Sequence, residues 1–262
     1  MIRADPLPAA TRYRAVVAYD GTRFQGFQRQ AGETLTVQAV LEAAIERVTG
    51  QRVTLKAAGR TDTGVHATGQ VIAFDVVWRH TPADLWRALN ANLPDDVAVH
   101  SLAEAPPDFH PRYDARSRVY EYTLYVAPAR HPLLDRYAWH VPVSQALNNQ
   151  MMQRAADLLL GTHDFAAFGQ PTQGESTVRQ VFCSQVQTLP APPPVTQLLR
   201  YRIEANGFLY HMVRRIVGAL VRVGSGALSL EELTRALEGA QGDWPNQAAP
   251  ARGLCLIAVT YE

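Results

Sequence analysis

A loop of small residues at positions 57–69 lies between two segments that suit β-strands, and it restricts the fold more than any other stretch of the chain. The flanking segments, 53–57 and 70–77, are rich in branched or aromatic residues, which are favoured in half-buried strands. Three glycines let the loop turn sharply or approach a ligand closely. The pattern therefore predicts a strand, a loop that presents Asp62, and a second strand.

Asp62 has Arg60 on one side and His66 on the other. One interpretation is an ordinary Asx-type turn with an Arg60–Asp62 ion pair on the surface. The crowding of three charged or titratable side chains into one loop favours a functional site instead. Rigid strands on both sides would hold the carboxylate of Asp62 in place.

The first part of the chain alternates strands and helices in the order βαββαβ. Thr36 is expected to cap the first helix and Gly50 to end it, and Thr81 to cap the second, with Pro82 at its first position. This order is typical of the ferredoxin-like fold. Strands are expected at 12–20, 53–57, 70–77 and 97–102.

Pro106 and Pro107 interrupt this pattern and predict a domain boundary that divides 1–107 from 108–262. The same order of elements then begins again. We therefore predict an α+β fold of two ferredoxin-like, RRM-like halves, whose mostly antiparallel sheets flank a central cleft. The second half is expected to have strands at 116–126, 177–189, 197–205 and 254–261, and helices at 144–160, at 209–223 and after a Ser229/Glu232 capping box.

Composition limits the function classes that fit the chain. Its 262 residues, 47% of them hydrophobic, can bury one large core or two smaller ones. The first eight residues contain no apolar run that would make a signal peptide, and no later run is long enough to span a membrane. Cys183 and Cys255 lack partners at metal-ligand spacing and are expected to be reduced packing residues. These observations predict a soluble, cytoplasmic protein.

Of the 25 lysine and arginine residues, only Lys56 is a lysine. Arginine binds phosphate bidentately and stacks on bases, although coding bias in a GC-rich genome explains the excess equally well. Clusters of arginine could line a local basic groove on a protein whose net charge is only +1. The clusters are Arg112, Arg116 and Arg118; Arg200 and Arg202; and Arg214, Arg215 and Arg222.

The helix expected at 209–223 has a buried stripe formed by residues 209, 213, 216, 217 and 220. Arg214 lies at the margin of this stripe, from which its side chain can reach a carboxylate held in a cleft. Arg215 and Arg222 lie opposite the stripe and are expected to be solvated.

Tyr120 and Tyr122 alternate along the strand expected at 116–126, so both side chains are expected on one face. Two interpretations remain open for these rings. An aromatic on a sheet face is either part of the core or a platform for a base.

Three other catalytic classes fit the chain poorly. Asp62-Thr63-Gly64 spells the triplet of aspartic proteases, which need two carboxylates that share a proton. The chain has no second such triplet; a homodimer could supply it, but Arg60 would keep the carboxylate ionised. The eight histidines form no paired metal-ligand motif with the carboxylates, and no serine nucleophile elbow is present.

The nine residues from Gly59 to Ala67 (GRTDTGVHA) resemble the catalytic motif of the bacterial tRNA pseudouridine synthase A family. The match extends over nearly the whole chain, from about Tyr19 to Tyr261. Phe27 stands where the family is expected to have tryptophan, which keeps an aromatic ring. Further matching segments are Tyr19–Gln30, Arg118–Tyr125, His163–Phe165, Gly207–Gly218 and Ala251–Leu254.

The resemblance implies the pseudouridine synthase fold and an isomerase that converts uridine to pseudouridine at positions 38, 39 and 40 of the tRNA anticodon arm. It also implies a homodimer that needs neither a metal nor a cofactor. Asp62 would be the catalytic carboxylate, Tyr120 would stack on the target uracil, and Arg214 would form a salt bridge with Asp62. The residues expected to contact substrate are Arg29, Arg60, His66, Tyr120 and Leu254.

Two questions of mechanism and function stay open at this point. Asp62 could attack ribose C1′ or take a proton from the ribose, and either role requires the ionised form, which Arg60 and Arg214 would favour. Tyr120 could also help to remove the proton from C5 of the uracil. The competing function is a tRNA-binding protein of the same fold that has lost catalysis.

Overall fold

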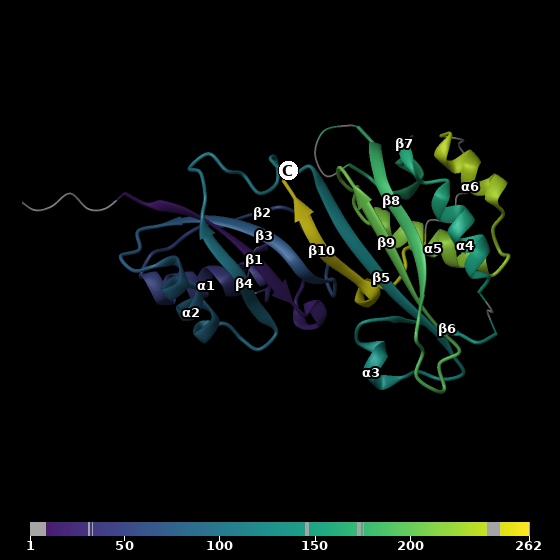
Figure 1. Cartoon of the computed structure of the whole chain (residues 1–262), viewed down its shortest axis with the longest axis horizontal. Helices are drawn as coiled ribbons and strands as arrows, with labels where there is room; N and C mark the ends of the chain where they lie inside the picture. The colour runs from purple at the N-terminus through teal and green to yellow at the C-terminus, as the bar shows by residue number, and fades with distance from the viewer. Residues whose placement is uncertain are drawn as a thin grey trace, which may run out of the picture. The chain divides into compact units, whose positions relative to one another are not determined.

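The computed structural model describes residues 9–30, 32, 34–144, 147–171, 174, 176–239 and 247–261. The chain divides into two compact units, Met1–Ala115 and Arg116–Glu262 (Figure 1). The first eight residues, in which the sequence predicts no signal peptide, lie outside the described residues. Within the described part of the chain, no helix is long and apolar enough to cross a membrane.

The strands of the first unit form an antiparallel sheet in the order β4-β1-β3-β2. A βαββαβ chain paired in this way is the ferredoxin-like arrangement that the sequence predicts. The strands are β1 (Thr11–Tyr19), β2 (Lys56–Ala57), β3 (His66–Val76) and β4 (Val97–Glu104).

The two helices of the first unit, α1 (Val37–Thr49) and α2 (Pro82–Asn92), pack against each other. Their ends lie where the sequence predicts. The side chain of Thr36 accepts a hydrogen bond from the backbone of α1, which ends at Gly50 with a φ of +71°. Thr81 forms a capping box with Asp84 at the start of α2.

The strands around the Asp62 loop differ in length from the prediction. The expected strand at 53–57 pairs with β3 only at Lys56–Ala57, whereas β3 begins at His66, before the expected start at 70. β3 is longer because β1 continues to pair with it, up to the pair Tyr19↔Ala67. The loop that carries Asp62 is therefore shorter than predicted, and both its ends are held by the sheet.

The second unit repeats this arrangement with additional elements. Its sheet has the order β10-β5-β9-β8-β7, and β6 pairs in parallel with the end of β5. The long strands β10, β5, β9 and β8 thus repeat the order of β4, β1, β3 and β2. The strands are β5 (Ser117–Ala127), β6 (Trp139–Pro142), β7 (Gly161–Asp164), β8 (Val178–Leu189), β9 (Gln197–Ala205) and β10 (Leu254–Thr260).

The helices of the second unit are α3 (Pro132–Asp135), α4 (Asn149–Asp157), α5 (Met212–Gly224) and α6 (Leu230–Leu237). Helix α5 begins later than the predicted position 209, because Tyr210 pairs with Gln170 and His211 has a φ of +62°. Helix α4 is shorter than the predicted 144–160, of which positions 145–146 lie outside the described residues. The capping box of Ser229 and Glu232 starts α6 as predicted.

The two faces of the second sheet differ in character. On β9, Tyr201 and Ile203 are buried, whereas Arg200 and Arg202 lie on the opposite face and are partly exposed. Both arginines pair with the carboxylate of Glu121 on β5, at 3.4 and 2.9 Å. This arginine cluster, noted in the sequence, is therefore partly neutralised by the neighbouring strand.

Candidate active site

Asp62 lies in the loop between β2 and β3, and it is partly exposed. Its carbonyl oxygen accepts a hydrogen bond from the amide of Val65 at 3.1 Å, which closes a tight turn. Gly64 completes this turn with a φ of +77°, a conformation that glycine adopts without strain. The turn fixes the backbone from which the Asp62 side chain projects.

A second loop, which follows β1, supports the Asp62 turn. The hydroxyl of Tyr19 lies 2.8 Å from the hydroxyl of Thr61, and the amide of Phe27 donates to the carbonyl of Thr61 at 3.0 Å. Gly26 passes so close that a Cβ atom there would lie 3.0 Å from the same carbonyl. The matching segment Tyr19–Gln30 thus contacts the residue that precedes Asp62.

His66 is buried, with 6% of its surface exposed, although the sequence predicts that it contacts substrate. Its Nδ1 accepts a hydrogen bond from the amide of Gly21 at 3.0 Å and lies 3.2 Å from the carboxylate of Asp20. These contacts favour a structural role inside the first unit over contact with a substrate. The register of β3, which extends to His66, is the feature that the sequence pattern did not reveal.

Arg60 is exposed and forms no ion pair with Asp62, both being described residues. The surface ion pair considered in the sequence analysis is therefore not formed in this structure, whereas Arg60 as one of the groups that favour the charged form of Asp62 stays a prediction. The guanidinium is instead available to a ligand. The backbone just before Arg60 is held in place, because the carbonyl of Gly59 accepts a hydrogen bond from the side chain of Gln70 at 2.9 Å.

Arg29 is held at the surface of the first unit by a buried carboxylate. Its guanidinium lies 3.1 Å from Glu42, whose side chain is 8% exposed, while the Arg29 side chain is 55% exposed. Glu42 also accepts hydrogen bonds from the side chain of Gln38 and the amide of Leu55. The ion pair holds one nitrogen of the guanidinium, while much of the Arg29 side chain stays accessible.

Tyr120 and Tyr122 lie in different environments on β5. Tyr120 is partly exposed, and its ring meets the ring of Phe208 edge to face at 5.1 Å. Tyr122 is fully buried, donates a hydrogen bond from its hydroxyl to the carbonyl of Pro250 at 2.7 Å, and packs against Trp139. Burial strongly raises the pKa of Tyr122, so its hydroxyl stays protonated. Tyr122 is thus a core residue, while part of the Tyr120 ring is open to a ligand.

Arg214 lies on α5 at the edge of the buried stripe, as predicted, and is partly exposed. Its Nε donates to the carbonyl of Ala249 at 2.7 Å, and its own carbonyl accepts from the amide of Ala249 at 3.0 Å. A Cβ atom at Gly218, one turn further on, would lie 2.5 Å from the carbonyl of Gln247. The segment at 247–250 therefore packs on α5 and orients Arg214, a role that its sequence did not indicate.

Arg215 and Arg222 are partly buried rather than solvated, so this part of the helix prediction is wrong. Their Nε atoms are buried without a hydrogen-bond partner among the described residues. Burial lowers the pKa of Arg215. The reason is that α5 is covered on more sides than its apolar stripe suggests, since Met212, Ala219 and other residues outside the stripe are also buried.

Leu254 begins β10 and lies opposite Tyr122 in the sheet. It is 6% exposed. The preceding residue, Gly253, approaches so closely that a Cβ atom there would lie 2.6 Å from the Tyr122 ring. The Ala251–Leu254 segment is thus packed tightly around a tyrosine of the Arg118–Tyr125 segment.

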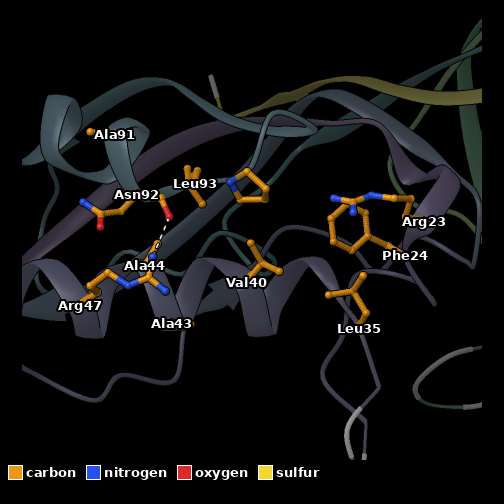
Figure 2. A pocket seen from close by; sticks show the side chains of 11 residues that line it. Arg23, Phe24, Leu35, Val40, Ala43, Ala44, Arg47, Ala91, Asn92 and Leu93 are labelled. Atoms are coloured by element: carbon orange, nitrogen blue, oxygen red, sulfur yellow. Dashed lines mark hydrogen bonds between the residues drawn. The ribbon is translucent and has the colours of Figure 1, made fainter.

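A pocket of about 480 Å³ lies elsewhere in the first unit, between α1 and the turn from α2 to β4 (Figure 2). Two arginines line it, but both have partners: Arg47 donates to the carbonyl of Asn92 at 3.2 Å, and Arg23 pairs with Asp96 at 2.7 Å. The other lining residues are mostly apolar, and none of the predicted site residues is among them. The pocket therefore offers no group for the predicted chemistry.

The described residues contain no cluster of three or more histidine, cysteine, aspartate or glutamate side chains that could hold a metal ion. Neither Cys183 nor Cys255 forms a disulfide bond within the described part of the chain. The chemistry that the predicted site residues can perform is that of a carboxylate, guanidinium groups and an aromatic ring. These groups suit proton transfer, nucleophilic attack and recognition of a base.

Comparisons with known proteins match the chain to the family described as tRNA pseudouridine synthase, over residues 15–114 and 155–262. These ranges include Asp62, Arg214 and Leu254 but not Tyr120. A tRNA pseudouridine synthase A of Pseudothermotoga lettingae is 41% identical over 95% of this chain and 99% of its own length. A protein of the same name from Streptococcus equi subsp. equi is 40% identical over 96% of this chain and 99% of its own length. Another, from Methylacidiphilum infernorum, is 41% identical over 97% of this chain and 96% of its own length.

Proposed function

The chain belongs to the tRNA pseudouridine synthase family, and from this premise we propose that it isomerises uridines in the anticodon arm of tRNA. The general activity, that of a tRNA pseudouridine synthase and hence an isomerase, follows from membership and from relatives about 40% identical over nearly the full chain. The two alternatives, an inactive tRNA-binding protein and an aspartic protease, receive no support from these comparisons.

The reaction requires three changes in the nucleoside. The bond from ribose C1′ to N1 of the uracil breaks, the free base turns while it stays bound, and a new bond joins C1′ to C5. The proton on C5 leaves and N1 gains a proton, so that no electrons are exchanged with another molecule. A carboxylate and an aromatic side chain that holds the uracil are therefore sufficient for the reaction, and we propose that no cofactor takes part.

We propose Asp62 as the catalytic carboxylate, which either attacks C1′ or takes a proton from the ribose. The observation that carries the proposal is the Asp62 turn, which leaves Asp62 partly exposed while both ends of the loop are held by the sheet. Preorganisation of this kind favours catalysis because the reacting group does not need to be ordered during the reaction.

We propose that Tyr120 stacks on the target uracil and that Arg214 keeps Asp62 ionised. The partly exposed ring of Tyr120, held by Phe208, supports stacking, and the anchoring of Arg214 to Ala249 supports a fixed guanidinium. The remaining candidates for substrate contact are Arg29 and Arg60, whose side chains are exposed, and Leu254 and His66, which are weaker candidates because both are buried.

Release of tritium from tRNA labelled at uridine C5 tests the catalytic role of Asp62. We expect Asp62→Asn to lower the release rate at least about a hundredfold, because an amide can neither attack C1′ nor accept the proton. Asp95→Asn is the matched control, since Asp95 is exposed in the turn before β4 and is expected to leave the rate unchanged. Undiminished release from the Asp62 variant would exclude the assignment.

The choice of positions 38, 39 and 40 can be tested with tRNAs that each keep a uridine at only one of them. We expect release of label from each such tRNA and none from a tRNA that lacks uridine at all three. We further propose that the protein is a homodimer and that it acts in the cytoplasm, where its tRNA substrates are found.

A further inference from the structure

We propose that Tyr19 and His66 are positioning residues, which fix the Asp62 turn from its two sides and so set the place of the carboxylate. The inference rests on the proposed function, since it takes Asp62 as the reacting group. Neither side chain needs to touch the tRNA for this role. Both residues lie in the first unit together with the turn that they hold.

The first anchor precedes Asp62 by one residue. The Tyr19 and Thr61 hydroxyls are 2.8 Å apart, and their residues are only 4% and 7% exposed. Because water has little access to either hydroxyl, solvent does not readily replace this hydrogen bond once it is lost. The backbone of Thr61 is also held, since its carbonyl accepts from the amide of Phe27. Rotation of Thr61, which would displace Asp62, therefore costs both contacts.

The second anchor follows Asp62 by four residues. The amide of Gly21 donates to Nδ1 of His66 at 3.0 Å. At the same place the two chain segments touch directly, because a Cβ atom at Gly21 would lie 2.0 Å from the carbonyl of Val65. The carboxylate of Asp20 lies 3.2 Å from the same nitrogen, but a nitrogen that accepts from Gly21 donates no hydrogen bond to it. The end of the turn is thus tied to the loop after β1.

Only the residues from Asp62 to Val65 lie between the two anchors, and their own turn is closed by a hydrogen bond. The carboxylate is therefore carried by a short segment with both ends fixed. A displacement of about 1 Å at a reacting group can lower a rate by about a hundredfold. Loss of either anchor should accordingly affect the chemical step more than tRNA binding.

The test of the first anchor compares Tyr19→Phe, Thr61→Val and the double variant. We expect each single variant to lower the single-turnover rate about tenfold while the Kd for tRNA stays within about twofold. The double variant should be no slower than the slower single variant, because the two hydroxyls act through one bond. Thr61→Ser keeps the hydroxyl and should restore most of the rate.

Tyr13→Phe is the matched control for Tyr19→Phe. Tyr13 lies on the same strand, is 2% exposed and stacks on Phe74 at 5.9 Å. A similar fall in melting temperature in both variants, with a slower rate only for Tyr19→Phe, would support positioning. Equal rates in the two variants, additive losses in the double variant or no recovery with Thr61→Ser would overturn the inference.

The second anchor is tested with His66→Asn and His66→Leu. The asparagine carbonyl can accept the hydrogen bond from Gly21, whereas leucine cannot, so we expect the asparagine variant to be faster by about tenfold at similar tRNA affinity. Equal rates would overturn the role of His66. Wild-type protein and Asp62→Asn are measured alongside. An inactive wild type, or an active Asp62→Asn variant, would refute the proposed function. An active wild type and an inactive Asp62→Asn variant, together with unchanged rates in the Tyr19 and His66 variants, would refute only the positioning role.

Discussion

Tyr120 and Tyr122 are two residues apart on β5, and they illustrate how one sequence pattern supports two roles. The sequence left open whether these rings belong to the core or form a platform for a base. Tyr122 is completely buried and uses its hydroxyl within the second unit, on Pro250. Tyr120 keeps part of its ring exposed beside Phe208. We therefore expect replacement by phenylalanine to have different effects at the two positions.

We expect Tyr120→Phe to bind tRNA normally but to lose turnover, because the ring remains for stacking while the hydroxyl that we propose helps to remove the C5 proton is gone. Tyr122→Phe should keep turnover and lower the free energy of unfolding by about 1–2 kcal/mol, since the buried carbonyl of Pro250 loses its donor. Tritium release, tRNA binding and urea unfolding measure these effects. Weakened binding with normal turnover in Tyr120→Phe would contradict the assignment.

At the scale of elements, a buried carboxylate connects three parts of the second unit. Asp135, on α3, accepts a hydrogen bond from Tyr125 on β5 and pairs with Arg130 and with Arg252, which lies just before β10. Burial alone raises the pKa of Asp135, but the hydrogen bond and charge of Arg130 and the charge of Arg252 outweigh it, so that the pKa lies below its ordinary value. The network thereby helps to hold the segment that leads into Leu254.

The lowered pKa of Asp135 predicts how stability depends on pH. Its contribution is fully present above the ordinary aspartate pKa and is lost as the pH falls through the lower pKa of the folded state. We expect Asp135→Asn to reduce the free energy of unfolding at pH 7 by about 2 kcal/mol. The difference from wild type should shrink in acid, below about pH 4.

Asp75→Asn is a suitable control, because Asp75 is 46% exposed in its pair with Arg12 and is expected to contribute less than about 1 kcal/mol. Urea unfolding of the three proteins at several pH values measures the effect. A difference between Asp135→Asn and wild type that stays constant from pH 7 to pH 3 would contradict the role of the ionised carboxylate.

At the scale of the whole molecule, the chain consists of two units with the same order of long strands, and the family match includes residues of both. The proposed catalytic residues are divided between them, Asp62 in the first and Tyr120 and Arg214 in the second. The proposed homodimer would bring two copies of each of these residues into one particle.

The proposed homodimer can be tested by light scattering. We expect a mass about twice the 28.9 kDa of one chain. A monomeric mass would refute the homodimer.

The sequence by itself determined the features that depend on near neighbours in the chain. Thr36, Thr81 and Ser229 cap helices as predicted, because a cap requires only a side chain and the amides two or three residues further on. The alternation of strands and helices and the motif around Asp62 likewise identified the fold class and the family. The short elements α3, β6 and β7 were missed, because segments of four residues carry too little periodicity to be recognised.

The tertiary structure alone decided which side chains are buried and what they contact. It placed His66 inside the first unit, left Arg60 without an ion pair to Asp62, and covered Arg215 and Arg222. The contact between Tyr19 and Thr61 joins residues 42 positions apart, which no local pattern reports. The physical reason is that burial and pairing depend on segments distant in sequence, whereas caps and strand alternation depend on the chain within a few residues.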